Sequence, residues 1–73
     1  MTNLQQERDH LALADRHIIE GRRRVANQTK LVETMARSGQ DTVMAATLLR
    51  TFEETLEAWH AHRRNILQAI DGR

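Results

Sequence analysis

The chain contains no cysteine and no proline, and it has no tyrosine among its 73 residues. Without cysteine there are no disulfides and no thiolate ligands for a structural zinc ion. A single core in a chain this short rarely contributes more than about 3–5 kcal/mol, so small proteins usually rely on disulfides, a metal or a partner chain. Because disulfides are excluded here, a partner chain is the stabilising factor that we favour.

Several functional classes lack their usual sequence patterns. There is no glycine-rich phosphate loop and no G-x-S-x-G motif, and Ser38 is the only serine. We therefore expect a protein that is not an enzyme, with no catalytic residues and no cofactor.

The sequence also lacks the patterns of membrane and secreted proteins. No apolar run approaches the roughly 18 residues of a membrane span, and the first ten residues, "MTNLQQERDH", do not resemble a signal peptide. The net charge of +1 gives no general attraction to polyanions. We expect a cytoplasmic protein with no membrane partner.

The residues that are present follow a heptad pattern in both halves of the chain. In the first half, one row repeats every seven residues: Leu4, Leu11, Ile18, Val25 and Val32. A weaker row follows each of these by three residues: Glu7, Ala14, Gly21, Gln28 and Met35. In the second half, seam residues alternate in steps of four and three: Ala45, Leu49, Phe52, Leu56, Trp59, Arg63, Ile66 and Ile70.

Helix-ending signals between the two halves predict a tight turn. Gly39 suits the left-handed position after a helix, and Asp41 suits the N-cap of the next helix. Thr2 and Gln5 form a capping box at the start of the chain. We predict one all-α domain over residues 1–73, an antiparallel, coiled-coil-like hairpin with helices over about 3–38 and 42–70 and a turn at 39–41.

Folding the hairpin at Gly39–Gln40 predicts which residues face each other. Trp59 then lies opposite Gly21, which would leave room for the indole in the core. The remaining pairs predicted by this register are Phe52 with Gln28, Ile66 with Ala14, and Ile70 with Leu11. Arg63 lies on the seam, and Asp15 is its predicted partner, because a buried charge must pair or reach solvent.

A two-helix seam leaves many apolar residues uncovered, and such patches usually mark an interface. We predict a homodimer in which two hairpins form a four-helix bundle. A groove for a helix of another protein is the alternative. The predicted interface residues are Leu31, Met35, Val43, Met44, Leu48, Leu13, Ile19 and Leu67.

Two Glu-x-x-His pairs, Glu7 with His10 and Glu57 with His60, have the spacing found in carboxylate-bridged metal proteins. In the predicted hairpin the two pairs lie far apart. A cross-helix pair of imidazoles could instead bind zinc weakly or act as a pH-sensitive contact. We favour solvated or seam-shielding side chains over a metal site. The candidate metal ligands are His17, His62, Glu57 and His60.

Basic residues cluster at similar levels of the two predicted helices, in "GRRR" and "HRR". A band of arginines could contact phosphates. Glutamates are interleaved and no aromatic residue is left for base stacking, so we favour a salt-bridged, solvated face over nucleic-acid binding. The candidate polyanion contacts are Arg22, Arg23, Arg24 and Arg64.

Three segments carry recognisable patterns: RHI-x-EG at residues 16–21, G-x-DT at 39–42, and LL-x-TFE…H-x-HR at 48–63. These patterns are similar to those of a group of small bacterial proteins of unknown function, found especially among proteobacteria. The resemblance covers most of the chain. It implies a helical hairpin and a bacterial, cytoplasmic origin, and it transfers no functional residues.

These patterns together predict a non-enzymatic protein-protein interaction or regulatory module that acts as a homo-oligomer. Its expected partner is a second copy of itself, with another protein as the further candidate. The alternatives are a nucleic-acid-associated regulator that uses the arginine band and a helical bundle that binds metal weakly.

Overall fold

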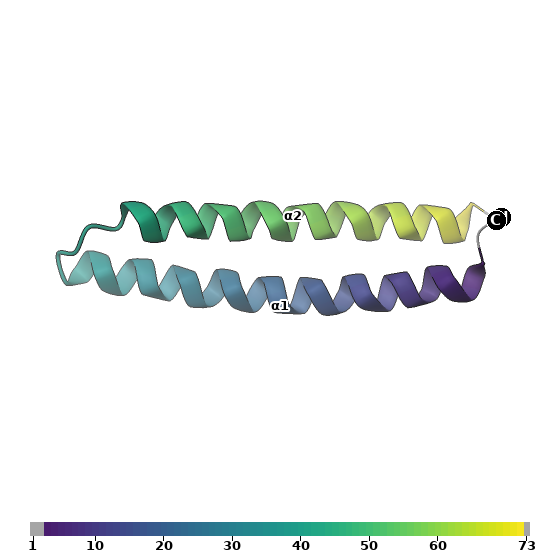
Figure 1. The fold of residues 1–73 in the computed structure, drawn as a ribbon, viewed down its shortest axis with the longest axis horizontal. Helices are drawn as coiled ribbons and strands as arrows, with labels where there is room; N and C mark the ends of the chain where they lie inside the picture. Colours follow the sequence, from purple (N-terminus) through teal and green to yellow (C-terminus); the bar gives the residue numbers. More distant parts are fainter. Residues whose placement is uncertain (1–2, 73) are drawn as a thin grey trace.

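The computed structural model describes residues 3–72, which form two long helices and no strand. Helix α1 spans Leu4–Arg37 and helix α2 spans Val43–Asp71. The helices lie side by side and run in opposite directions, as Figure 1 shows, in a rod of 55 × 14 × 13 Å. The predicted all-α antiparallel hairpin is confirmed. Within the described range, neither helix is long and apolar enough to cross a membrane.

The first helix begins with a side-chain cap. Asn3 is the N-cap of α1, and its Oδ1 accepts a hydrogen bond from the backbone N–H of Gln5 at 2.8 Å. This bond satisfies one of the free N–H groups in the first helical turn. The capping box predicted from Thr2 lies outside the described residues.

A Schellman motif ends α1. Gly39 has a φ of 74°, the left-handed conformation that glycine adopts without steric cost. Its N–H donates to the Ala36 carbonyl at 3.1 Å, and the Gln40 N–H donates to the Met35 carbonyl at 2.9 Å. The predicted role of Gly39 is confirmed.

The start of α2 differs from the prediction by one residue. The N-cap position belongs to Thr42 and not to Asp41. Asp41 still supports the helix, because its Oδ1 accepts a hydrogen bond from the Val43 N–H at 2.9 Å. The carboxylate reaches two residues along the chain, as Asx turns do, and so acts from just outside the helix.

The core follows the predicted seam and is thin. Among the described residues the buried ones are Glu7, Ala14, Ile18, Gln28 and Ile66, and all of them are seam positions. No large side chain in this range is fully buried. The Gln28 Nε2 donates to the Ala45 carbonyl at 2.9 Å, so this polar seam residue joins the two helices directly.

The predicted register between the helices is wrong by about one helical turn. A Cβ atom on Gly21 would lie 3.1 Å from Leu56 Cδ1, so Leu56 and not Trp59 faces the glycine. Figure 1 gives the cause: the segment between the helices runs back beside the last turn of α1, and α2 starts short of the end of α1. Non-helical residues advance further than about 1.5 Å each, so a short connection shifts the pairing.

Because both helices are continuous, the same shift applies along the whole seam. The partners predicted for Phe52, Ile66 and Ile70 therefore move by about one turn as well. The heptad rows themselves are unaffected, since the shift changes the level at which residues meet and not the face on which they lie.

Candidate functional site

The seam has two flanks, and they differ in chemistry. The seam of each helix consists of two rows: the row of Ile18 and the row of Gly21 in α1, and the row of Leu49 and the row of Trp59 in α2. In an antiparallel pair of heptad helices, residues that directly follow the Gly21 and Trp59 rows meet on one side of the seam, and residues that directly precede the Ile18 and Leu49 rows meet on the other. We call the first side the Asp15 flank; its members include Asp15, Arg22 and His60. We call the second side the His17 flank; its members include His17, Leu31, Leu48 and His62.

An ion pair crosses the seam at the Asp15 flank. The Arg63 Nε–H donates to Asp15 Oδ1 at 2.6 Å, which confirms the predicted pairing. The two side chains are 38% and 47% exposed, so the guanidinium reaches the edge of the seam and keeps contact with solvent. The bond uses one of the five N–H donors of the guanidinium and holds the group beside α1.

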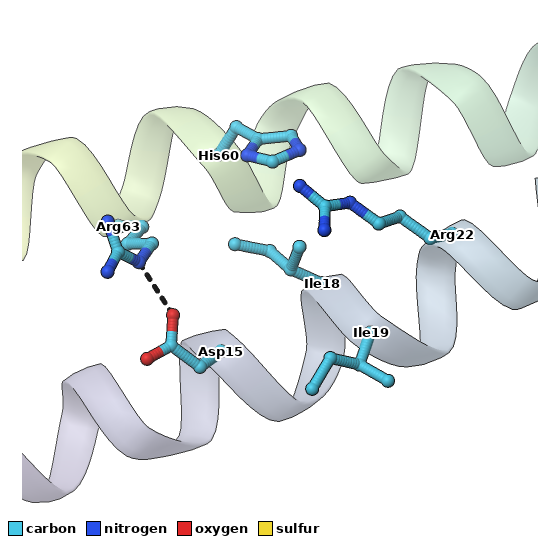
Figure 2. A pocket seen from close by; sticks show the side chains of 6 residues that line it. All are labelled: Asp15, Ile18, Ile19, Arg22, His60 and Arg63. Carbon is cyan, nitrogen blue, oxygen red and sulfur yellow. Dashed lines mark hydrogen bonds and ion pairs between the residues drawn. The ribbon is translucent and has the colours of Figure 1, made fainter.

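A groove of about 500 Å³ opens beside this ion pair. Figure 2 shows its side chains projecting from both helices, with Ile18 between the two arginines. The groove is lined by Asp15, Ile18, Ile19, Arg22, His60 and Arg63. Its walls therefore combine two guanidinium groups, an imidazole and a carboxylate over two isoleucines.

Arg22 is the member of the groove with no fixed partner. Its guanidinium extends across the groove toward His60 on the opposite helix (Figure 2). Within residues 3–72 it takes part in no ion pair or side-chain hydrogen bond. The donors of Arg22 are thus free to bind an acceptor from solution.

The His17 flank carries an aromatic cluster in place of the predicted packing of Trp59 on Gly21. The His17 ring stacks on the Trp59 ring, with centroids 4.2 Å apart and planes at 12°. The His62 ring meets the same indole edge-on at 5.6 Å and 70°. Glu20 Oε2 lies 3.8 Å from His17 Nδ1. The indole is half-buried and in contact with both imidazoles, so it serves as a seam residue and as part of a surface cluster.

The four candidate metal ligands do not form one site. His17 and His62 contact Trp59, whereas His60 lines the groove on the opposite flank. Glu57 Oε1 lies 3.7 Å from Arg64 Nη2. Within residues 3–72, no group of three or more carboxylate or imidazole side chains could hold a metal ion.

An apolar groove lies near the turn. It is lined by Gln28, Leu31, Met35, Met44, Ala45, Thr47, Leu48 and Thr51. Four of the predicted interface residues, Leu31, Met35, Met44 and Leu48, meet there, and Met44 is 85% exposed. The structure therefore gathers residues from both helices into one uncovered apolar surface.

The other predicted interface residues lie elsewhere. Val43 and Leu13 are exposed outside the apolar groove, and Leu67 is half-buried. Ile19, which is 60% exposed, lines the groove on the Asp15 flank. The predicted interface thus divides into one continuous groove and several separate positions.

The candidate polyanion contacts do not form one continuous surface either. Successive helical residues point about 100° apart, so Arg22, Arg23 and Arg24 project in different directions. All three are exposed, and only Arg22 lines the groove on the Asp15 flank. Arg64 lies next to Glu57 on its own helix.

Sequence reasoning assigned Asp15 and Arg63 to a structural contact and did not foresee the groove that they line. The heptad spacing of the sequence already indicated that residues of this groove share one side of the seam. Asp15 and Arg22 lie seven residues apart, and His60 directly follows the seam residue Trp59, so all three belong to one flank.

No protein-family model matches this chain, and neither a curated protein nor a solved structure matches it significantly. The similarity to small bacterial hairpin proteins therefore stays a prediction from the three sequence segments.

Proposed function

We propose that this chain is a non-enzymatic interaction or regulatory module that acts as a homodimer, in which two hairpins pack into a four-helix bundle. The apolar groove near the turn carries the proposal. Leu31, Met44 and Leu48 come from both helices, and all three are solvent-exposed in the single hairpin. Burial of apolar surface is the main driving force of association, so this groove is the surface that gains most from a partner.

The exposed area of the hairpin supports a second copy as that partner. The chain exposes 5618 Å². A folded monomer of the same mass, 8.5 kDa, typically exposes about 4,700 Å². The excess is close to the roughly 800 Å² that each partner buries in a standard interface. A second copy of the hairpin would therefore bury an area about equal to the surface that this chain exposes in excess of a typical monomer.

Two-fold symmetry gives the simplest arrangement. A two-fold axis pairs a surface with itself, and most soluble homo-oligomers are closed in this way. With groove against groove, Leu31, Met44 and Leu48 of one chain would pack on the same residues of its partner. Long antiparallel helices of similar length are well suited to the side-by-side packing of a bundle.

Light scattering over a dilution series tests the proposal. We expect twice the mass of one chain, and we expect Leu48→Glu to reduce it to the mass of one chain, because the new carboxylate would lie inside the interface. Ala26→Glu is the matched control: it adds the same charge at an exposed position outside the groove and should leave the mass unchanged. Circular dichroism of both variants would verify that the helices are retained.

A parent chain that stays monomeric at high concentration would overturn the dimer. The apolar groove would then be the docking surface for a helix of another protein. If Leu48→Glu and Ala26→Glu lowered the mass equally, the interface would lie on a different surface from the groove.

A further inference from the structure

The groove on the Asp15 flank has a chemistry that self-association does not use. Asp15, Arg22 and His60 place this groove on the Asp15 flank, whereas Leu31 and Leu48 belong to the His17 flank on the opposite side of the seam. We propose that this groove binds a small organic oxyanion, a carboxylate or phosphate that carries a compact apolar substituent.

The charges in the groove favour an anion. The groove lining contains two guanidinium groups, Arg22 and Arg63, and one carboxylate, Asp15, so one net positive charge remains when His60 is neutral. Arginine stays charged at all ordinary pH values and presents its donors in a planar fork that matches carboxylate and phosphate oxygens. The groove thus matches an anion in both sign and geometry.

The free hydrogen-bond donors are placed on both sides of the groove. Asp15 binds Arg63 through Nε, so the terminal N–H groups of that guanidinium are not used in this bond. Arg22 approaches from the other helix, beside His60 (Figure 2). An oxyanion seated between the two guanidinium groups could accept from both helices at once, and charge-assisted bonds of this kind are stronger than neutral ones.

The apolar floor of the groove is the reason that we expect an apolar substituent on the ligand. Ile18 is 5% exposed and forms the base, and Ile19 presents an exposed side chain at the edge. Small-molecule sites generally combine apolar walls with a few polar groups in a volume of about 300–1,000 Å³. The groove, at about 500 Å³, falls within that range.

Titration with phenyl phosphate, followed by NMR of the arginine side-chain N–H groups, tests the proposal. Sodium chloride keeps the ionic strength constant. We expect saturable shifts of the Arg22 and Arg63 signals, and weaker binding of inorganic phosphate, which has no apolar part. Equal affinity for the two probes would overturn the apolar part of the proposal, and shifts that never saturate would overturn the site.

Three variants locate the binding. Arg22→Gln should weaken phenyl phosphate binding about tenfold or more, as for loss of a hydrogen bond to a charged group. Arg23→Gln removes the same charge outside the groove and should leave the affinity nearly unchanged. Asp15→Asn keeps an oxygen for Arg63 and removes the negative charge, so it should tighten binding.

Equal losses in Arg22→Gln and Arg23→Gln would show general charge attraction and would contradict the site. Weaker binding in Asp15→Asn would contradict it as well. Light scattering of the same samples keeps this result separate from the dimer, because none of these substitutions touches the apolar groove.

Discussion

The contact between His17 and Trp59 shows how single residues stabilise so thin a core. The rings are nearly parallel, with planes at 12° and centroids 4.2 Å apart, and they join the two helices. Offset stacking of aromatic rings contributes about 0.5–1.5 kcal/mol beyond the area that it buries. In a chain with few buried hydrophobic residues, a contact of that size is a substantial share of the stability.

Replacing His17 by alanine should therefore lower the free energy of unfolding by about 0.5–1.5 kcal/mol, because the indole loses its stacked partner. Urea unfolding followed by circular dichroism would measure the change. His10→Ala is the matched control, since His10 lies one heptad away on the same flank and is exposed. Equal effects of the two substitutions would mean that the stacked geometry contributes nothing of its own.

The contact of Gly21 with the opposite helix shows the register in which the two helices pack. Leu56 fills the space in front of this glycine, and a Cβ there would already be within 3.1 Å of its side chain. Real Cβ atoms seldom come so close to a neighbour, so a larger side chain at this position requires Leu56 to move. The close approach gives a reason for a glycine inside a long helix, where it costs about 1 kcal/mol relative to alanine.

Gly21→Leu should destabilise the hairpin by about 1–3 kcal/mol through overpacking. The same substitution in a Leu56→Ala background should cost clearly less, since the shortened side chain makes room. In a Trp59→Ala background the cost should persist. Double-mutant cycles from urea unfolding would measure the coupling. If Trp59→Ala reduced the cost of Gly21→Leu and Leu56→Ala did not, the register predicted from the sequence would be correct, and the contact between Leu56 and Gly21 would be contradicted.

At the scale of the whole molecule, the single hairpin is long and thinly packed. Its radius of gyration is 16.6 Å, whereas a compact chain of this length has a value of about 11 Å. A rod two helices wide leaves both flanks of the seam open to solvent, and the apolar groove lies on one of them. Stability and association are expected to be linked for this reason.

If folding and dimerisation are coupled, the thermal midpoint should rise with protein concentration. A tenfold increase corresponds to about 1.4 kcal/mol. One kcal/mol shifts the midpoint of a unit of roughly 150 residues by about 2–4 °C, so a rise of a few degrees per tenfold is expected. Calorimetry at three concentrations would measure it. A constant midpoint would indicate that each hairpin folds alone.

The sequence by itself determined the two helices, the turn at Gly39 and the residues that form the seam. It also identified Asp15 as the partner of Arg63, because a charged seam residue needs a nearby opposite charge. These features depend on local conformational preference and on heptad spacing, both of which are properties of the chain alone.

Only the tertiary structure decided which residues meet across the seam. A heptad pattern repeats along the helix, so it specifies the face that each residue occupies and leaves the level of its partner open. The non-helical connection, residues 38–42, sets that level, and it placed Leu56 at Gly21 and Trp59 beside His17. Both grooves depend on the same placement, because each combines side chains from two helices at matching levels.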